Sequence, residues 1–239
     1  MKKLLHYLLL PMPSFIKVAC YRWLLGYEVE SGVRIGLSIV SAGKCRIGRN
    51  ARIGHFNFIS SIGRLDLGKD SVIGHFNILL GGDSVDIGDA AVIGRFNEIN
   101  SIINPLNSNP ADPRLVVGRA AVITAWHKID YTDRVVIGES AIVAGRSSCL
   151  WTHNRQQVRP IEIGRNCYVG SGIQMAPGSS IGAYSVVGLG SVITKAFSDE
   201  YVLVAGVPAR VIKPLDQESR TMVEFPTRPD LEPPAAAAQ

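Results

Sequence analysis

The sequence has few aromatic residues and no regular cysteine spacing. Only 7% of its 239 residues are Phe, Trp or Tyr, whereas 24 are glycine and the aliphatic residues are largely Val and Ile. That balance favours strands joined by tight turns over packed helices. Cys20, Cys45, Cys149 and Cys167 form no CxxC pair, which is typical of reduced thiols in a cytoplasmic protein. The composition therefore predicts an all-β protein without a disulfide framework.

Basic runs are also missing, although the chain carries a modest positive excess. The formal charge is +5 and the pI is about 9.1. Such a balance suits a polyanionic partner, for example a nucleotide cofactor or an anionic membrane surface. Because no dense Lys/Arg run, helix-turn-helix pattern or zinc-finger spacing occurs, we expect no nucleic-acid partner.

Long apolar segments are absent, so no stretch of about 18 residues could span a bilayer. The Leu-rich start contains His6, breaks at Pro11 and lacks an Ala-x-Ala site, which is not typical of a secretory signal. Helical spacing of apolar residues instead predicts a short helix from Ser14, as its cap, to Gly26. We expect this helix to pack on the protein itself, with contact between residues 1–27 and a membrane surface as the alternative.

A regular repeat begins at Val33. An aliphatic residue followed by Gly returns in pairs six residues apart, and the pairs recur every twenty residues, at Ile47, Ile53, Leu67, Ile73, Ile87 and Ile93. After Ile163 strict hexads follow. One inward aliphatic residue in every six requires a short strand and a corner per hexad, with three hexads per coil. Stacked coils would form three parallel sheets with strands about 4.8 Å apart, and the repeated Gly is expected to supply positive φ at the turns.

The sequence thus predicts an all-β fold, a parallel β-helix over residues 31–213. A short helical segment, 1–30, precedes it, and an irregular tail, 214–239, rich in proline and expected to be flexible, follows it. Two excursions, 104–114 and 154–160, interrupt the repeat. Loops of this kind usually lie on one face of a solenoid and border the binding site.

Two segments in the last third resemble a known family. They are IEIGRNCYVGSGIQMAPGSSIGAYSVVGLGSVITK and VAGVPARVIK, which resemble the C-terminal signature of hexapeptide-repeat acyltransferases, in particular maltose- and galactoside-type and exopolysaccharide O-acetyltransferases. The resemblance covers roughly Val33 to Lys213. It implies left-handed winding, a homotrimer, acetyl-CoA as acyl donor, and a saccharide acceptor as in cell-surface polysaccharide synthesis. A non-catalytic hexapeptide scaffold, and a zinc-dependent hydratase similar to γ-type carbonic anhydrases, are the alternatives.

Acyl transfer to a hydroxyl needs a base, and histidine is the natural one near neutral pH. His153, in WTHNRQ just before the strict hexads, lies where similar enzymes have their catalytic histidine. The twenty-residue register puts Asp133 one coil below, so we expect Asp133 to orient the His153 ring. His127, Asp130 and Trp151 are candidates for lining the acceptor cleft.

Two ladders of side chains are expected at neighbouring register positions. They are Asn57, Asn77 and Asn97, and Phe56, Phe76, Phe96 and Trp126. His127 continues the asparagine ladder, so a purely structural role for it is the competing interpretation. The aromatic ladder is expected to pack against the N-terminal helix or a neighbouring subunit. His55 and His75 share one position, but without HxxxxH spacing we expect a solvated surface pair and no metal.

The resemblance also implies a set of residues that contact coenzyme A. They are Ser171, Leu189, Thr194, Lys195, Arg210 and Lys213. The basic residues among them suit the phosphates of the cofactor. Leu189 departs from the family, which usually has Ala there, and its larger side chain alters the path expected for the pantetheine arm.

Overall fold

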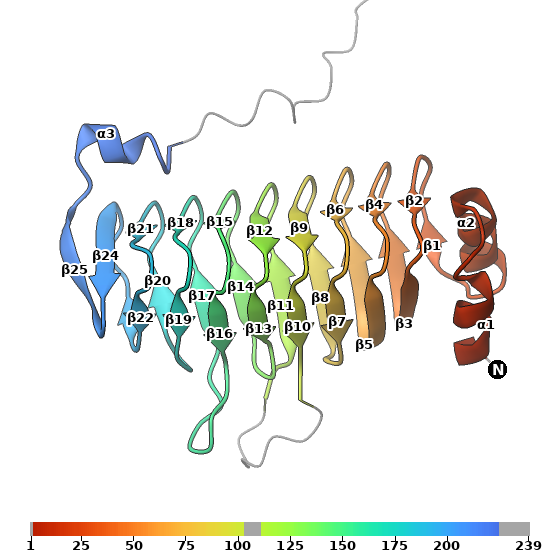
Figure 1. The fold of residues 1–239 in the computed structure, drawn as a ribbon, viewed down its shortest axis with the longest axis horizontal. Helices are drawn as coiled ribbons and strands as arrows, with labels where there is room; N and C mark the ends of the chain where they lie inside the picture. Colours follow the sequence, from red (N-terminus) through yellow and green to blue (C-terminus); the bar gives the residue numbers. More distant parts are fainter. Residues whose placement is uncertain (1, 103–110, 225–239) are drawn as a thin grey trace, which may run out of the picture.

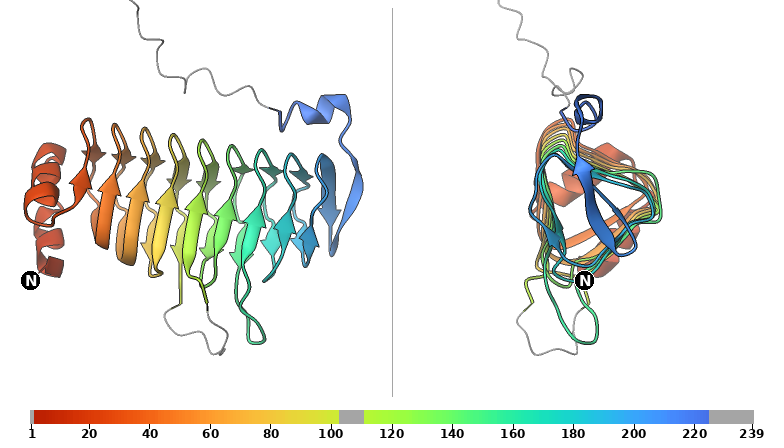
Figure 2. Two further views of the ribbon diagram at one scale, coloured as in Figure 1. Left: turned by 180° about the vertical axis from the view of Figure 1, so that it is seen from behind. Right: turned by 90° about the vertical axis from the view of Figure 1, so that its left-hand side faces the viewer.

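The computed structural model describes residues 2–102 and 111–224. Short strands wind into stacked coils that form a long prism (Figure 1), and the view along its axis shows a triangular outline (Figure 2). Every strand pair along the coils is parallel, apart from one antiparallel hairpin at the C-terminal end. The parallel β-helix predicted from the repeat is therefore confirmed.

Three faces make up the prism, here named A, B and C. Face A contains the first part of β3 (Ile39–Ile47) and of β5 (Phe58–Leu67), then β7 (Ile78–Leu80), β10 (Glu98–Asn100), β13 (Lys128–Asp130), β16 (Cys149–Trp151), β19 (Gln174–Met175) and β22 (Val192–Ile193). Face B contains β1 (Glu28–Val29), the remainder of β3 and β5, β8 (Ser84–Ile87), β11 (Arg114–Val117), β14 (Val135–Ile137), β17 (Ile161–Ile163), β20 (Ser180–Ile181) and β23 (Ala196–Phe197). Since β3 and β5 each turn one corner, they join the two faces.

Face C is continuous from one end of the prism to the other. It contains β2 (Arg34–Ile35), β4 (Arg52–Ile53), β6 (Val72–Ile73), β9 (Val92–Arg95), β12 (Val122–Ala125), β15 (Ile142–Val143), β18 (Tyr168–Val169), β21 (Val186–Val187), β24 (Val202–Gly206) and the antiparallel β25 (Ala209–Pro214). Its inward residues Ile73, Ile93 and Ile123 stack in register and are fully buried. Each such side chain contributes about 2 kcal/mol of burial, which no coil achieves alone.

The repeated glycines serve close packing of coils and do not supply positive φ. A Cβ added to Gly68, Gly88 or Gly118 would come within 2.5–2.7 Å of a backbone nitrogen in the next coil. The positive φ angles of this corner, 55–57°, belong to residues two positions later, such as Asp70 and Ala90. The sequence-based explanation of these glycines was therefore wrong, because contact between coils and not φ excludes a side chain.

Two helices, α1 (Lys2–Leu9) and α2 (Ser14–Trp23), cover the N-terminal end of the prism (Figure 1). Only α2 was predicted. Ser14 does not cap it; the Ser14 hydroxyl accepts a hydrogen bond from the Ile35 backbone N–H at 2.8 Å and so fastens α2 to β2. Lys17 is fully buried and donates to the carbonyl oxygen of Gly36. In the described ranges no helix is long and apolar enough to cross a membrane.

The first part of the predicted flexible tail packs on the prism. It includes α3 (Gln217–Arg220), and Val223 is buried. The Asn166 side chain donates to the Val223 carbonyl oxygen at 3.0 Å, and Arg220 lies over the Tyr201 ring. Residues 225–239, and most of the predicted excursion 104–114, lie outside the described residues.

Candidate active site

His153 lies at the corner where face A turns into face B. It follows β16 and directly precedes the predicted excursion 154–160. An antiparallel bridge between His153 and Val158 closes the base of this loop. Its Nδ1 is 2.6 Å from Oδ2 of Asp130, and 24% of the side chain is exposed. The ring is thus held from inside the coil while part of it faces solvent.

Asp130, at the end of β13 one coil below, is buried among hydrogen-bond donors. Its Oδ1 accepts from the backbone N–H and hydroxyl of Thr132, at 3.1 and 2.6 Å. Its Oδ2 accepts from the backbone N–H and hydroxyl of Thr152, at 3.1 and 2.9 Å, and from the backbone N–H of His153 at 3.2 Å. These donors fix the carboxylate against Nδ1. A neutral imidazole held this way carries its hydrogen on Nδ1 and its lone pair on Nε2.

The structure places Asp130, and not Asp133, against the His153 ring. The carboxylate of Asp133 instead accepts from the backbone N–H of Arg134 at 2.7 Å and of Asp112 at 3.2 Å. The twenty-residue register fails here for two reasons. The coil of His153 has one extra residue at a corner, so the register aligns His153 with Thr132 and not with Asp133. The His153 ring also reaches two residues farther back, to Asp130, the register partner of Trp151. Strands β12 and β15 pair with an offset of twenty, whereas β13 and β16 pair with an offset of twenty-one.

His127 lies inside the coil, where hydrogen bonds hold its ring and its backbone. It is buried, its Nδ1 accepts from the Ser148 backbone N–H at 3.2 Å, and its Nε2 lies 2.9 Å from the Thr124 hydroxyl. Its backbone N–H donates to the Asn97 side chain at 3.0 Å, which ends the asparagine ladder. Burial lowers the pKa of His127 to about 4, so the ring is neutral near pH 7. This burial supports the structural interpretation of His127, and its contact with an acceptor stays a prediction.

Two threonines were missed by the sequence reasoning. Thr132 and Thr152 supply four of the hydrogen bonds to Asp130. The available signal was the pair DYT and WTH on successive coils, which places one threonine two residues after Asp130 and another directly before His153. Trp151, which precedes Thr152, projects outward from β16 beside the His153 corner and is exposed.

The predicted cofactor residues occupy two corners that border face A, and the C-terminal hairpin. Ser171 and Leu189 lie at the corner between faces C and A, where the Gly190 backbone N–H donates to the Ser171 carbonyl oxygen at 2.8 Å. Thr194 and Lys195 follow β22 and are exposed at the His153 corner, two coils farther on. Arg210 and Lys213 lie on β25; Lys213 is 2.9 Å from a carboxylate oxygen of Asp216.

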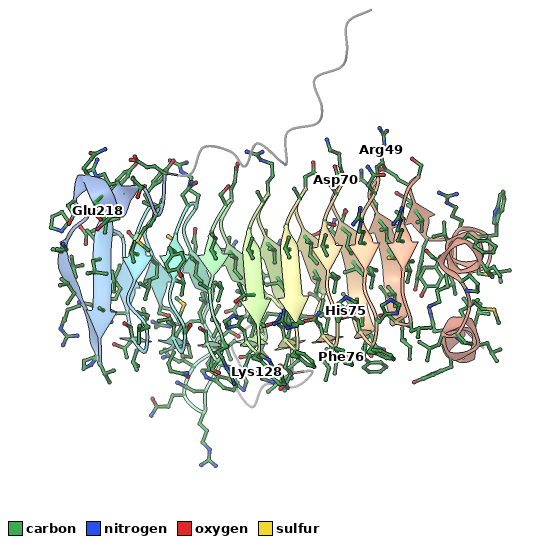
Figure 3. The ribbon with its side chains drawn as sticks, turned by 45° about the horizontal axis from the view of Figure 1, so that its top comes forward. Arg49, Asp70, His75, Phe76, Lys128 and Glu218 are labelled. Atoms are coloured by element: carbon green, nitrogen blue, oxygen red, sulfur yellow. The ribbon has the colours of Figure 1, made fainter. Side chains whose placement is uncertain are left out.

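The aromatic residues and the histidine pair singled out in the sequence form ladders along the corner between faces C and A. Four rings stack at centroid distances of 5.0, 4.9 and 4.3 Å, namely Phe56, Phe76, Phe96 and Trp126. The rings of His55 and His75 stack at 5.5 Å, and Nδ1 of His75 accepts from the His55 backbone N–H. Figure 3 shows His75 and Phe76 at this edge of the prism. Across residues 2–102 and 111–224, no three His, Cys, Asp or Glu side chains could hold a metal ion together.

Comparison with known proteins finds acetyltransferases. No protein-family model matches the sequence. The galactoside O-acetyltransferase of Escherichia coli K12 is 35% identical over 101 residues, 38% of this chain and 48% of that protein. A putative acetyltransferase of Saccharomyces cerevisiae is 28% identical over 110 residues, 46% of this chain and 47% of that protein. The chain thus spans about half the length of these curated relatives.

Solved structures with related coils include a polySia-specific acetyltransferase, NeuO, at a TM-score of 0.48 and 20% identity, covering 79% of this chain and 85% of that one. LpxA from Acinetobacter baumannii has a TM-score of 0.46 and 16% identity, and the match covers 83% of this chain and 78% of that one. The sequence matches to acetyltransferases, together with the repeat and the β-helix, agree with the resemblance to hexapeptide-repeat acyltransferases.

Proposed function

We propose that this chain transfers an acetyl group from acetyl-CoA to a hydroxyl of a saccharide, with His153 as the general base. The observation that carries the proposal is the Asp130–His153 pair, 2.6 Å apart, in which Nδ1 is occupied and the ring is partly exposed. A buried carboxylate behind a partly exposed imidazole is the arrangement that orients a catalytic histidine. The names of the matched relatives support the same chemistry.

In the proposed reaction, Nε2 of His153 takes the proton from the acceptor hydroxyl. The hydroxyl oxygen then attacks the thioester carbonyl, the carbon–sulfur bond breaks, and the thiolate leaves with the proton that His153 had taken. Asp130 stays ionised throughout and stabilises the imidazolium. A thioester donor supplies the activated acyl carbon, so the chain itself needs no covalent intermediate.

We further propose a homotrimer in which two protomers build each site. His153, Thr194 and Lys195 lie along one corner of the prism, whereas Ser171 and Leu189 lie along another. Face A, which is roughly 15 Å wide, separates the two corners. Within a single chain, a thioester held at one corner would therefore lie far from a base at the other. A neighbouring copy that offers its other corner would bring both groups together. Trp151, exposed beside His153, would then contact the saccharide.

Release of free thiol from acetyl-CoA tests the proposal. The purified full-length chain is given galactosides, amino sugars and oligosaccharides as acceptors, and thiol release is measured with product analysis for ester or amide. We expect ester formation, and a loss of about 10³-fold or more in kcat for His153→Ala.

His75→Asn is the matched control, because His75 is an exposed histidine three coils away from His153 and should leave turnover unchanged. Failure of every acceptor to release thiol would favour the non-catalytic scaffold. Full activity in His153→Ala would discard the base assignment while keeping the transferase. Amide in place of ester would change the acceptor class and leave the proposed base in place.

A further inference from the structure

The N-terminal end of the prism exposes large apolar side chains. On α2, Trp23 is 85% exposed and Phe15 is 74% exposed, and Leu24 follows the helix. On α1, Tyr7 and Leu8 are exposed as well. Large aromatic side chains are seldom so accessible on a protein that has no partner at that surface. Their inner neighbours hold the helices firmly, since Lys17 and Tyr21 are buried against the first coil.

The positive charge of the chain is concentrated at the same end. Residues 1–53, which comprise both helices and the strands up to β4, hold nine Lys or Arg and two Asp or Glu, a formal charge of +7. Residues 54–239 hold 16 Lys or Arg and 18 Asp or Glu, a formal charge of −2. The excess of +5 therefore comes entirely from the first two coils and the helices that cover them.

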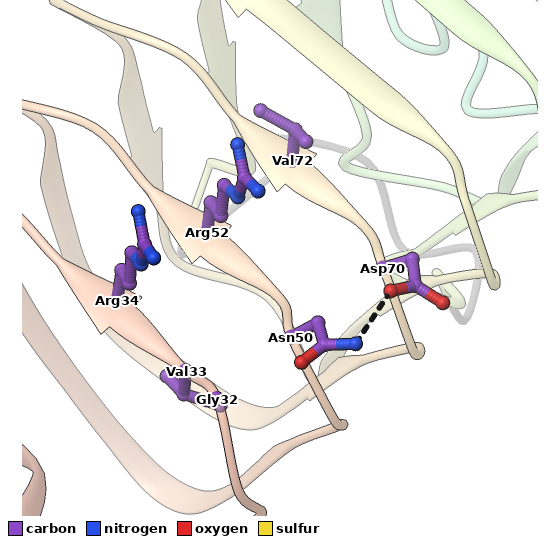
Figure 4. A pocket seen from close by; sticks show the side chains of 7 residues that line it. All are labelled: Gly32, Val33, Arg34, Asn50, Arg52, Asp70 and Val72. Atoms are coloured by element: carbon purple, nitrogen blue, oxygen red, sulfur yellow. Dashed lines mark hydrogen bonds between the residues drawn. The ribbon is translucent and has the colours of Figure 1, made fainter. Parts of the chain in front are cut away.

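Two of these basic residues stand together over a hollow. Arg34 on β2 and Arg52 on β4 are register partners on face C, and their guanidinium groups point the same way (Figure 4). They line a depression of about 650 Å³ together with Asn50 and Asp70, whose side chains bond each other at 3.0 Å. Within the described part of the chain, neither guanidinium has an ion pair or a side-chain hydrogen bond. The pair is free to bind an external anion.

This hollow is continuous with an apolar groove under α2. The groove, of about 610 Å³, runs between α2 and the turn at residues 30–34, and Phe15, Val18 and Trp23 line it. Arg34 borders both spaces. Apolar side chains and a pair of arginines thus meet at one end of the molecule.

We propose that this end docks on an anionic lipid surface. The cap surface, defined as Tyr7, Leu8, Phe15, Trp23, Leu24, Arg34 and Arg52, would place its aromatic and aliphatic side chains among the headgroups and acyl chains. Its two arginines would bind lipid phosphates. A basic, partly helical surface with exposed Trp, Tyr and Leu has the composition of interfacial membrane anchors. The inference does not depend on the proposed acetyl transfer.

Charge favours lipid over a second copy of the chain as the occupant. Two cap surfaces brought together would oppose two ends that each carry about +7, which repel each other. An anionic bilayer attracts the same charge. The exposed apolar residues also come from two separate helices, which suits a soft interface better than a closely packed protein contact.

Vesicle binding by the full-length chain tests the proposal. Sedimentation is measured with vesicles of phosphatidylcholine alone and of equal parts phosphatidylcholine and phosphatidylglycerol. We expect binding only to the anionic vesicles. Phe15→Ser with Trp23→Ser should weaken it about 100-fold, and Arg34→Gln with Arg52→Gln about 20- to 30-fold at low salt. Binding should also blue-shift Trp fluorescence in the wild type and not in Trp23→Phe.

Ile212→Ser and Arg95→Gln are matched controls, because both side chains are exposed away from the cap surface and should leave binding unchanged. Circular dichroism verifies that each variant folds. The proposal is overturned if anionic vesicles do not bind the wild type, or bind it and the cap variants equally. A second outcome also overturns it. Light scattering would show that the wild type pairs into larger assemblies, the Phe15→Ser, Trp23→Ser double variant would no longer pair, and vesicles would bind neither protein.

Discussion

At the residue scale, the proposed acid–base pair depends on the Asp130 carboxylate, which is surrounded by hydrogen-bond donors. Asp130 accepts six hydrogen bonds, of which the one from His153 Nδ1 is the shortest to Oδ2. The two threonines therefore position the Asp130 carboxylate, and the carboxylate in turn orients the His153 ring. A change at Asp130 should affect chemistry more than substrate affinity, because it alters the tautomer of His153 and not the cleft.

Asp130→Asn tests this chain of contacts. An amide N–H facing Nδ1 would force the hydrogen onto Nε2, so the ring could no longer take a proton from the acceptor. We expect kcat to fall by about 10²-fold or more while KM changes little. Steady-state kinetics measure both parameters. Asp133→Asn is the control and should retain most of the turnover; the reverse ranking would restore Asp133 as the orienting residue.

His127 should make the fold sensitive to acid. Its folded pKa, lowered to about 4 by burial, lies below the unfolded value of about 6.5. Between these values the unfolded chain takes up a proton that the folded chain refuses, so stability falls as pH drops from about 6.5 and levels off below about 4. The loss amounts to roughly 3–3.5 kcal/mol, at about 1.4 kcal/mol per pKa unit over about 2.5 units.

His127→Asn should remove this loss, because asparagine does not titrate and already fills the equivalent position in three earlier coils. Denaturant unfolding of both proteins between pH 7 and pH 4 gives the difference. At pH 7 the two should agree within about 1 kcal/mol. Parallel pH dependences in the two proteins would show that His127 is not the titrating group.

At the scale of the single coil, the left-handed positions at the corner between faces C and A carry aromatic side chains in four successive coils. Phe76 has φ of 57° and stacks on Phe56 and Phe96. Such φ is costly for a residue with a Cβ, so ring stacking must outweigh the backbone strain. We expect Phe76→Ala to destabilise the fold by about 2 kcal/mol, and Phe76→Gly by about 1 kcal/mol less than that.

Thermal unfolding ranks these variants. Ile78, an exposed residue on the adjacent strand β7, provides the comparison, since alanine there should be more stable than glycine as at any ordinary strand position. If Phe76→Ala is more stable than Phe76→Gly, stacking and not backbone conformation decides the residue at this corner.

The same coils show how far the sequence could be read. Aliphatic residues every six positions predicted the winding and the core, and the asparagine ladder followed from the twenty-residue register, because a β-helix repeats its geometry from coil to coil. The partner of His153 could not be found that way. One additional residue in the corner at 144–148 shifts the later strand, and a count along the chain does not reveal which corner absorbs it. Even with that residue counted, the register aligns His153 with Thr132, whereas the ring contacts Asp130 two residues earlier. Helix α1 was missed for another reason, since its eight residues gain stability from packing on the first coil.

At the scale of the whole molecule, the prism separates three surfaces. The cap surface lies at the N-terminal end, the Asp130–His153 pair lies about five coils farther on, and the basic residues of β25 lie at the other end. At about 4.8 Å per coil, an end-on membrane contact would hold His153 roughly 24 Å above the lipid. The proposed site would then reach sugar units distant from a membrane anchor more readily than units next to it.

The proposed site between two protomers predicts complementation between inactive chains. His153→Ala removes the base from one corner, and Leu189→Glu places a negative charge in the proposed cofactor path at the other. A trimer that contains both variants has three interfaces, and one of them, about a third, combines an intact His153 with an intact Leu189 from the neighbour. We expect that fraction of wild-type thiol release from assemblies purified with a tag on each variant.

Mixing His153→Ala with Asp130→Asn is the control, because both changes damage the same corner and no interface recovers an intact pair. A site contained within one chain would give no recovery in either mixture, since every chain then carries one defect. Recovery in the first mixture alone therefore requires that the imidazole of one protomer works on a thioester held by the next. The prism geometry favours that outcome, because a full face separates His153 from Ser171 and Leu189 within each chain.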